Sequence, residues 1–371
     1  MQIRELSKTM GKLRIDWYLF APAFLISLAG LVTMNSFSGD QHFFIRQSIW
    51  ILISLCVFFV ASSIDWRFIR QTRVLVSMFL FTVFILLMLF GLGHMAKGAQ
   101  SWFSFGAFSF QPSDLAKLIT ILMLAKYFSR RHIEIANVRH IIVSGVYAFI
   151  IFILVLLQPD FGGAVIIFLV WFGMLLVSGI SKKHLAVVTL VGVVSVSLMW
   201  VFVFAPYQKA RISNFIHPLA NIRGSGYNAY QSTIAVGSGQ IFGKGIGQGS
   251  QSKLRFLPEF QTDFIFASFS EEWGFVGTLI LILLVMSLLY RIIINSEHSS
   301  SNFEALFGLG VCILFIIHIL IHAGMNMGVM PVTGITFPFM SYGGSHLVSE
   351  WLALGMLSSM KSHSTGPRIY S

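Results

Sequence analysis

Apolar and polar positions follow one another along this chain in long blocks. Ten mostly apolar stretches, each 17 to 26 residues long, are separated by more polar segments. They lie at 17–37, 43–63, 73–93, 112–128, 141–157, 163–180, 184–204, 263–288, 303–326 and 343–360. Since a helix of about 20 apolar residues crosses the hydrocarbon core of a bilayer, the pattern predicts about ten transmembrane helices. The stretches at 112–128, 163–180 and 343–360 are short or polar for this role.

The composition narrows the class of protein. Hydrophobic residues make up 56% of the 371 positions and charged residues only 11%, with a mean hydropathy of +0.80. Soluble domains carry roughly 25% charged residues, so a soluble enzyme, a disordered chain and a nucleic-acid-binding module are excluded. The predicted fold class is an all-α integral membrane protein, with residues 1–371 forming a single polytopic membrane domain.

Basic residues predict the orientation of this domain. The net charge is +11, and 16 of the 25 Lys and Arg residues lie at one set of helix ends, together with both termini. The positive-inside rule makes that side cytoplasmic. Six of the other nine lie in the segment 205–260, which therefore becomes a large extracytoplasmic loop between the seventh and eighth spans. These six are Lys209, Arg211, Arg223, Lys244, Lys253 and Arg255. The segment also contains many aromatic residues, so we expect it to pack against the helices.

Asp263 is the first candidate for chemistry. It opens the eighth apolar stretch, shortly after Leu257-Pro258-Glu259. One interpretation is an acid that stabilises a helix N-terminus by about 0.3–1 kcal/mol. The other is a carboxylate that faces a groove and acts as a general base or binds a cation, with Glu259 as its neighbour. Position alone leaves both interpretations open.

Lys117 is the second candidate, because a lysine inside a membrane span needs an anionic partner. Asp114, three residues earlier, would supply one on the same helix, and the phosphate of a ligand would serve equally well. Glu271 and Glu272 lie deeper in the eighth span, where we expect an internal, paired structural role. His318 and His322 are spaced as metal ligands can be, but helix packing is the favoured interpretation.

A glycine-rich run at 237–250 surrounds Lys244. It differs from a Walker A loop, because Ser238 stands where the first glycine belongs and Gly245 stands where Ser or Thr belongs. Glycines permit backbone N–H groups to approach an anion closely, and they equally permit a compact loop that lies on the helices. Together, these features suit an anionic headgroup on a lipid tail. Arg and Lys would contact phosphate, and a divalent cation would bridge carboxylate and pyrophosphate.

Ordered motifs over residues 15–360 give the chain a specific resemblance. They are Trp102-Phe103, Phe110-Gln111-Pro112-Ser113 with Lys117, Gln158-Pro159-Asp160-Phe161-Gly162, Arg211-Ile212, Gly226-Tyr227, Gln231-Ser232, Gly243-Lys244-Gly245, Leu257-Pro258-Glu259 with Thr262-Asp263-Phe264, Glu271-Glu272, and Pro338 with Ser341-Tyr342-Gly343-Gly344-Ser345. The chain resembles the shape, elongation, division and sporulation family of bacterial wall-synthesis proteins. The stretches 249–252 and 256–259 and the short termini favour its elongation branch over its division branch. Trp273, Thr336 and His346 depart from the family pattern.

The resemblance implies a peptidoglycan glycosyltransferase that polymerises lipid II at the outer face of the bacterial cytoplasmic membrane. It implies that Asp263 is the catalytic residue and also the site of a Mg²⁺ or Mn²⁺ ion, and it implies no organic cofactor. Further residues are implied to bind substrate: Lys117, Arg211, Lys244, Trp102, Gln111, Glu259 and Ser341. Implied partners are a class B penicillin-binding protein and other elongation-complex membrane proteins, without nucleic acid. Three alternatives stay open: a division-specific member of the family, a lipid II flippase, and a scaffold that recruits other wall enzymes.

Overall fold

The computed structural model describes most of the chain. The described residues are 15–36, 41–96, 99–105, 108–130, 138–218, 224, 226–254 and 256–364. Two basic residues of the predicted loop, Arg223 and Arg255, lie outside these ranges.

A helix occupies each of the ten apolar stretches. These helices are α2 (Trp17–Asn35), α3 (Gln41–Ser63), α4 (Thr72–Leu92), α5 (Pro112–Ser129), α6 (Val138–Leu157), α7 (Phe161–Val177), α8 (Lys182–Phe202), α12 (Ile265–Glu297), α13 (Asn302–Asn326) and α14 (Gly344–Ser364). Within the described residues, seven are long and apolar enough to cross a membrane: α2, α3, α4, α6, α8, α12 and α13. The remaining three, α5, α7 and α14, come from the stretches that are short or polar.

Two connecting segments are more ordered than predicted. The segment 205–260 contains α9 (Pro206–Ile216), α10 (Tyr227–Ser238) and the short α11 (Ser250–Lys253). Between α4 and α5, a small antiparallel sheet has the order β1 (His94–Ala96), β2 (Ala99–Phe105), β3 (Phe108–Phe110). The prediction of a purely helical fold missed this sheet, because β1 and β3 have only three residues each and apolar and polar residues do not alternate regularly along β2. A 3-10 turn, η1 (Trp66–Arg70), precedes α4.

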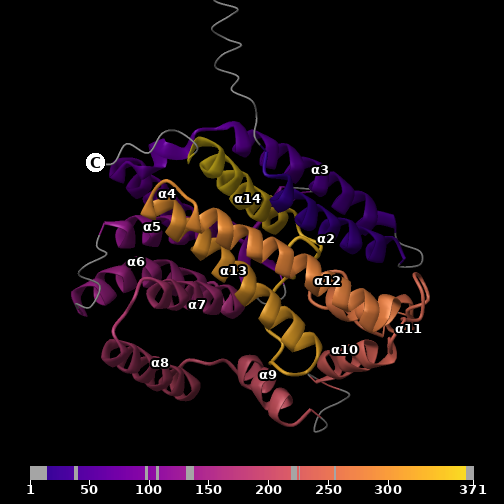
Figure 1. Ribbon diagram of the computed structural model, residues 1–371. Coiled ribbons are helices and arrows are strands. Elements are labelled where there is room, and N and C mark those ends of the chain that lie inside the picture. The colour runs from indigo at the N-terminus through magenta and orange to yellow at the C-terminus, as the bar shows by residue number, and fades with distance from the viewer. Residues whose placement is uncertain are drawn as a thin grey trace, which may run out of the picture.

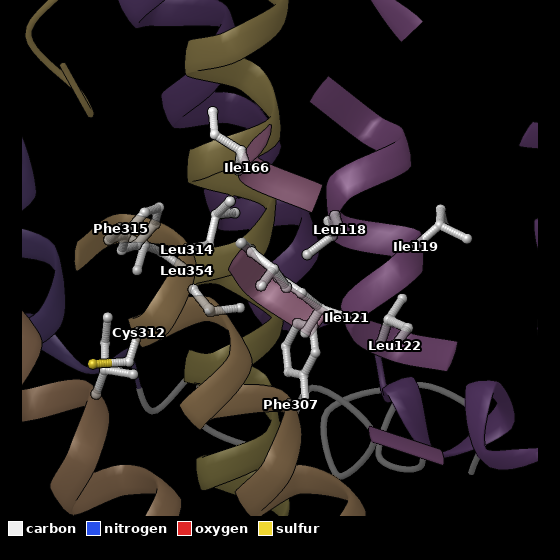
Figure 2. Packing of buried hydrophobic residues seen from close by; sticks show 14 of the residues in the cluster. Leu118, Ile119, Ile121, Leu122, Ile166, Phe307, Cys312, Leu314, Phe315 and Leu354 are labelled. Carbon is white, nitrogen blue, oxygen red and sulfur yellow. The ribbon is translucent and has the colours of Figure 1, made fainter. Parts of the chain in front are cut away.

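The centre of the bundle is built around α5, α13 and α14 (Figure 1). Most α5 side chains are buried, since α4, α6, α7, α13 and α14 all pack against this helix. Figure 2 shows Leu118, Ile121 and Leu122 of α5 together with Phe307 and Leu314 of α13 in this apolar core. In contrast, α8 lies apart from the bundle, and none of its residues is buried. This packing places the polar side chains of α5 in the interior of the protein.

A polar clamp joins α2, α12 and α14 at one end of the bundle. The buried carboxylate of Asp16, just before α2, accepts hydrogen bonds from Arg291 Nε at 3.0 Å, Asn295 Nδ2 at 2.8 Å and Lys361 Nζ at 2.6 Å. Burial opposes the charge of this carboxylate, but the bonds from Arg291, Lys361 and Asn295 outweigh it and hold the pKa of Asp16 below its ordinary value.

The clamp makes the stability of the bundle depend on pH. Because the pKa of Asp16 is lower in the folded protein, its contribution is present above the unfolded value of about 3.9 and is lost as the pH falls through the folded value. Asp16→Asn should therefore lower the melting temperature in detergent at pH 7, and this difference should shrink below about pH 4. An equal difference at both pH values would contradict this account, and Asp65→Asn, at an exposed ion pair, is the control.

Candidate active site

A cavity of about 430 Å³ brings most of the predicted site residues together. Of the eight, Asp263, Lys117, Arg211, Trp102 and Gln111 line it. Its walls come from β2, the N-terminal parts of α5, α7 and α9, the turn before α12, the segment 333–336 and the start of α14. The five predicted residues that share this cavity are up to about 160 positions apart in the sequence.

Asp263 lies in a turn just ahead of α12, two residues before the helix begins. The turn starts at Glu259, which has a φ of +54°, and the Asp263 N–H donates to the Glu259 carbonyl at 3.1 Å. Asn326 Nδ2 of α13 donates to the Asp263 carbonyl at 3.0 Å. The backbone of the catalytic candidate is therefore fixed from two directions, while its side chain lines the cavity.

Glu259 and Ser341, which are predicted to bind substrate, make hydrogen bonds that shape this turn. The Glu259 carboxylate accepts a hydrogen bond from the Thr262 hydroxyl at 3.1 Å. Ser341 is buried, and its hydroxyl donates to the Thr262 carbonyl at 2.9 Å and accepts the Phe337 N–H at 2.7 Å. Neither side chain is among those that line the cavity. Their geometry is that of residues that position Asp263.

The α5 wall of the cavity holds a buried ion pair. Lys117 Nζ lies 3.0 Å from Asp114 Oδ1, and both side chains are almost completely buried. Ser345, on α14, donates its hydroxyl proton to Asp114 Oδ2 at 3.0 Å. Both interpretations of Lys117 are therefore compatible with the geometry, since the lysine pairs with Asp114 and also lines the cavity.

Asp160 lines the same cavity and was not predicted as a site residue. It precedes α7 and accepts the Gly163 N–H at 2.8 Å, and Gln111 Nε2 donates to its other oxygen at 3.1 Å. Burial raises the pKa of Asp160, although the Gly163 N–H and the charge of Lys117 oppose this change. Gln111 thus holds an acidic side chain of the cavity wall. The scarcity of acids, with only 14 in the chain, is the signal that could have pointed to Asp160.

Arg211 reaches the cavity from α9. Its side chain donates to the Thr333 carbonyl at 3.4 Å, and its guanidinium lies 5.9 Å from the centre of the Tyr207 ring. Arg46 of α3 and His318 of α13 also line the cavity and were not assigned to the site. The residues that line the cavity therefore include both carboxylates and cations.

Lys244 does not line this cavity. Its ammonium lies 2.7 Å from Glu271 Oε1 on α12 and 2.9 Å from the Ser250 hydroxyl. Glu272 accepts hydrogen bonds from the hydroxyl of Ser36 and from the N–H of Gly247. The expectation of an internal, paired structural role for the two glutamates is confirmed, and the predicted substrate contact of Lys244 stays a prediction.

Removal of Lys244 should destabilise the protein. Glu271 is fully buried, and a buried charge that loses its partner costs about 3–5 kcal/mol. Lys244→Met should lower the melting temperature in detergent, and Lys244→Met/Glu271→Gln should recover much of the loss. If both variants melted like wild type while substrate binding fell, Lys244 would be a ligand of the substrate after all.

Comparison with known proteins identifies the family. A family model described as "Cell cycle protein" and covering FtsW, RodA and SpoVE matches residues 13–366. This chain belongs to the FtsW/RodA/SpoVE family. The resemblance seen in the motifs is thereby confirmed over nearly the whole chain.

Several relatives in this family are similar along most of their length. The "Probable peptidoglycan glycosyltransferase FtsW" of Haemophilus influenzae is 35% identical, over 92% of this chain and 89% of that protein. "Stage V sporulation protein E" of Bacillus subtilis is 33% identical, over 96% and 99%. "Peptidoglycan glycosyltransferase MrdB" of Escherichia coli K12 is 33% identical, over 77% of each. The relatives thus include proteins named for sporulation and for peptidoglycan synthesis.

Solved structures share this fold along nearly the whole chain. A chain from a structure described as "Structural coordination of polymerization and crosslinking by a peptidoglycan synthase complex" superposes with a TM-score of 0.81 at 28% identity, over 95% of this chain and 98% of that one. The Rod shape determining protein RodA of Thermus thermophilus gives a TM-score of 0.73 at 27% identity, over 96% and 99%. The predicted helical membrane fold is therefore confirmed.

The described residues were examined for the ligands of a resident metal ion. Within the described ranges, no group of three or more His, Cys, Asp or Glu side chains is placed to hold a metal ion. Asp263 supplies a single carboxylate, so a cation bound to it would take oxygens of the substrate among its other ligands. The predicted Mg²⁺ or Mn²⁺ ion stays a prediction.

Proposed function

We propose that this chain, a peptidoglycan glycosyltransferase of the FtsW/RodA/SpoVE family, polymerises lipid II into glycan strands during cell elongation, at the outer face of the cytoplasmic membrane. The single observation that carries the proposal is the cavity in which the Asp263 carboxylate and the cations of Lys117 and Arg211 lie together. A base and a set of cations in one chamber suit a reaction that deprotonates a hydroxyl group and releases a pyrophosphate.

An apolar groove next to the cavity supports a lipid-linked substrate. It has a volume of about 570 Å³, lies between α6, α7 and the outlying α8, and is lined almost entirely by apolar side chains. Phe161 lines both the groove and the polar cavity. Figure 1 shows α8 set apart from the other long helices. A substrate with its headgroup in the cavity can place its hydrocarbon chain in this groove.

The proposed reaction is a single displacement. The Asp263 carboxylate takes the proton from the GlcNAc 4-hydroxyl of one lipid II molecule as that oxygen bonds to C1 of the MurNAc at the end of the growing glycan. The bond from C1 to undecaprenyl pyrophosphate breaks, and the leaving group keeps its electron pair. The attack inverts C1 from α to β. Lys117 and Arg211 stabilise the charge that develops on the pyrophosphate, and a divalent cation carried by that pyrophosphate would add to this stabilisation.

A crosslinking enzyme is the proposed partner. The solved synthase complex is described as coordinating polymerisation with crosslinking, and this supports pairing with a class B penicillin-binding protein. The assignment to elongation rests on the motif at 249–252 and 256–259 and agrees with the likeness to RodA. Relatives named FtsW are just as similar, so complementation of an elongation-defective strain, compared with a division-defective one, is the test of this point.

The activity itself is tested with purified protein and its penicillin-binding partner in liposomes. Lipid II is supplied with Mg²⁺ or Mn²⁺, and glycan strands are resolved on a gel. Strand formation is the expected result. Transport of lipid II across sealed liposomes without any strands would replace the proposed enzyme with a flippase.

A further inference from the structure

His346 lies between the buried carboxylates of Asp114 and Glu350, and we call these three side chains and Lys117 the charged floor of the site. It belongs to the first turn of α14, and its Nε2 is 2.7 Å from Glu350 Oε1 on the same helix. Its Nδ1 is 3.7 Å from Asp114 Oδ1 on α5. His346, Asp114 and Lys117 line the active-site cavity, and a smaller adjoining void reaches Glu350. The polar site therefore continues past Lys117 into the interior of the bundle.

The two carboxylates are arranged in the same way around this ring. Each uses one oxygen for a neutral donor: Glu350 Oε2 accepts the Phe339 N–H at 2.8 Å, and Asp114 Oδ2 accepts the Ser345 hydroxyl at 3.0 Å. Each turns its other oxygen toward an imidazole nitrogen of His346. The ring nitrogens lie 2.7 Å from Glu350 Oε1 and 3.7 Å from Asp114 Oδ1, and two negative charges so close to one buried ring favour its positively charged, imidazolium form.

The other groups that face His346 do not supply a second positive charge to the pair of carboxylates. From α13, His318 stacks on its ring at 5.1 Å between ring centres and directs its own Nδ1 to the Thr336 carbonyl at 3.3 Å. From α5, Lys117 is bound to Asp114 at 3.0 Å. With a neutral ring at position 346, one ammonium would face two carboxylates, and the floor would carry a net negative charge. With an imidazolium, the two positive charges of Lys117 and His346 equal the two negative charges of Asp114 and Glu350.

We propose that His346 is a positioning residue whose imidazolium neutralises Asp114 and Glu350, so that the Lys117 ammonium is available to the pyrophosphate of the substrate. The proposal rests on the function proposed above. A negative floor would repel a pyrophosphate and hold Lys117 on the carboxylates, because opposite charges interact strongly where water is excluded. His346 thus sets the charge of the site without touching the reacting atoms.

Charge-paired variants test the role. His346→Gln should raise the KM for lipid II about tenfold or more and also lower kcat, because Lys117 then contacts the pyrophosphate less well both in the bound substrate and as its charge develops. His346→Gln/Glu350→Gln removes one charge of each sign and should bring the KM back toward the wild-type value. Glu350→Gln alone leaves an excess positive charge, and its KM should be no higher than that of wild type. His140→Gln, which alters a buried histidine bonded to Tyr127 on α5, is the control and should leave the KM unchanged.

A binding measurement separates this proposal from the reaction itself. Inorganic pyrophosphate should raise the melting temperature of wild type in detergent and of the double variant, and should do so less for His346→Gln. A wild-type KM for His346→Gln, or a double variant no better than the single one, would overturn the role of His346 even if wild type makes glycan strands. Absence of strands from wild type would instead overturn the proposed function.

Discussion

Asp263→Ala should lower the rate of lipid II polymerisation at least about a hundredfold, because general bases contribute about 10²–10⁴ to the rate. The carboxylate lines the cavity, and its backbone is fixed by Glu259 and Asn326. Removal of the side chain leaves these backbone bonds in place, so the protein should remain folded. The measurement is the initial rate of glycan strand formation by wild type and variant at equal protein concentration.

Two further variants define the role of Asp263. Asp263→Asn keeps the shape of the side chain but cannot accept the proton, so it should be as inactive as Asp263→Ala. Asp65→Asn, which changes an exposed carboxylate paired with Arg67, should polymerise lipid II like wild type. A melting temperature near that of wild type excludes unfolding as the cause. Normal polymerisation by Asp263→Ala would mean that another group deprotonates the acceptor.

The helices could be predicted from the sequence because a bilayer demands long apolar stretches, and each of the ten stretches is a helix. The small sheet formed by β1, β2 and β3 could not be predicted in this way, since a short connection outside the bilayer does not need a long apolar stretch. Among site residues, Asp263 and Lys117 stood out because charges are rare in apolar stretches. The pairing of His346 with Asp114 could not be predicted, because it depends on how α14 packs against α5, more than 200 positions away.

The glycine-rich run shows that one motif is compatible with more than one contact. Its glycines would permit backbone N–H groups to approach a phosphate closely. In the structure they allow the loop to lie directly against the backbone of α12. Gly243 has a φ of +81°, and a Cβ there would lie 2.1 Å from the Glu272 carbonyl oxygen. Lys244 is consequently drawn to Glu271. Sequence alone shows that glycine permits a close approach, but not whether an anion or a helix is approached.

Lys117→Met should reduce both the activity and the stability of the protein. Loss of the ammonium removes a cation from the developing pyrophosphate charge, and a single electrostatic contact of this kind is worth about 10²–10³ in kcat. It also leaves Asp114 without its closest cation in a buried site, at a cost of up to about 3–5 kcal/mol. The single variant therefore cannot separate the substrate contact from the ion pair.

The double variant Lys117→Met/Asp114→Asn makes that separation, because it removes both charges of the pair. We expect its melting temperature in detergent to return toward the wild-type value, since His346 and Glu350 still balance each other, while strand formation stays about as low as in Lys117→Met. If the melting temperature and strand formation both recovered, the role of Lys117 would be limited to its ion pair with Asp114. Recovery of stability alone would show that the lysine serves the substrate, because its structural partner is then no longer there to account for the loss.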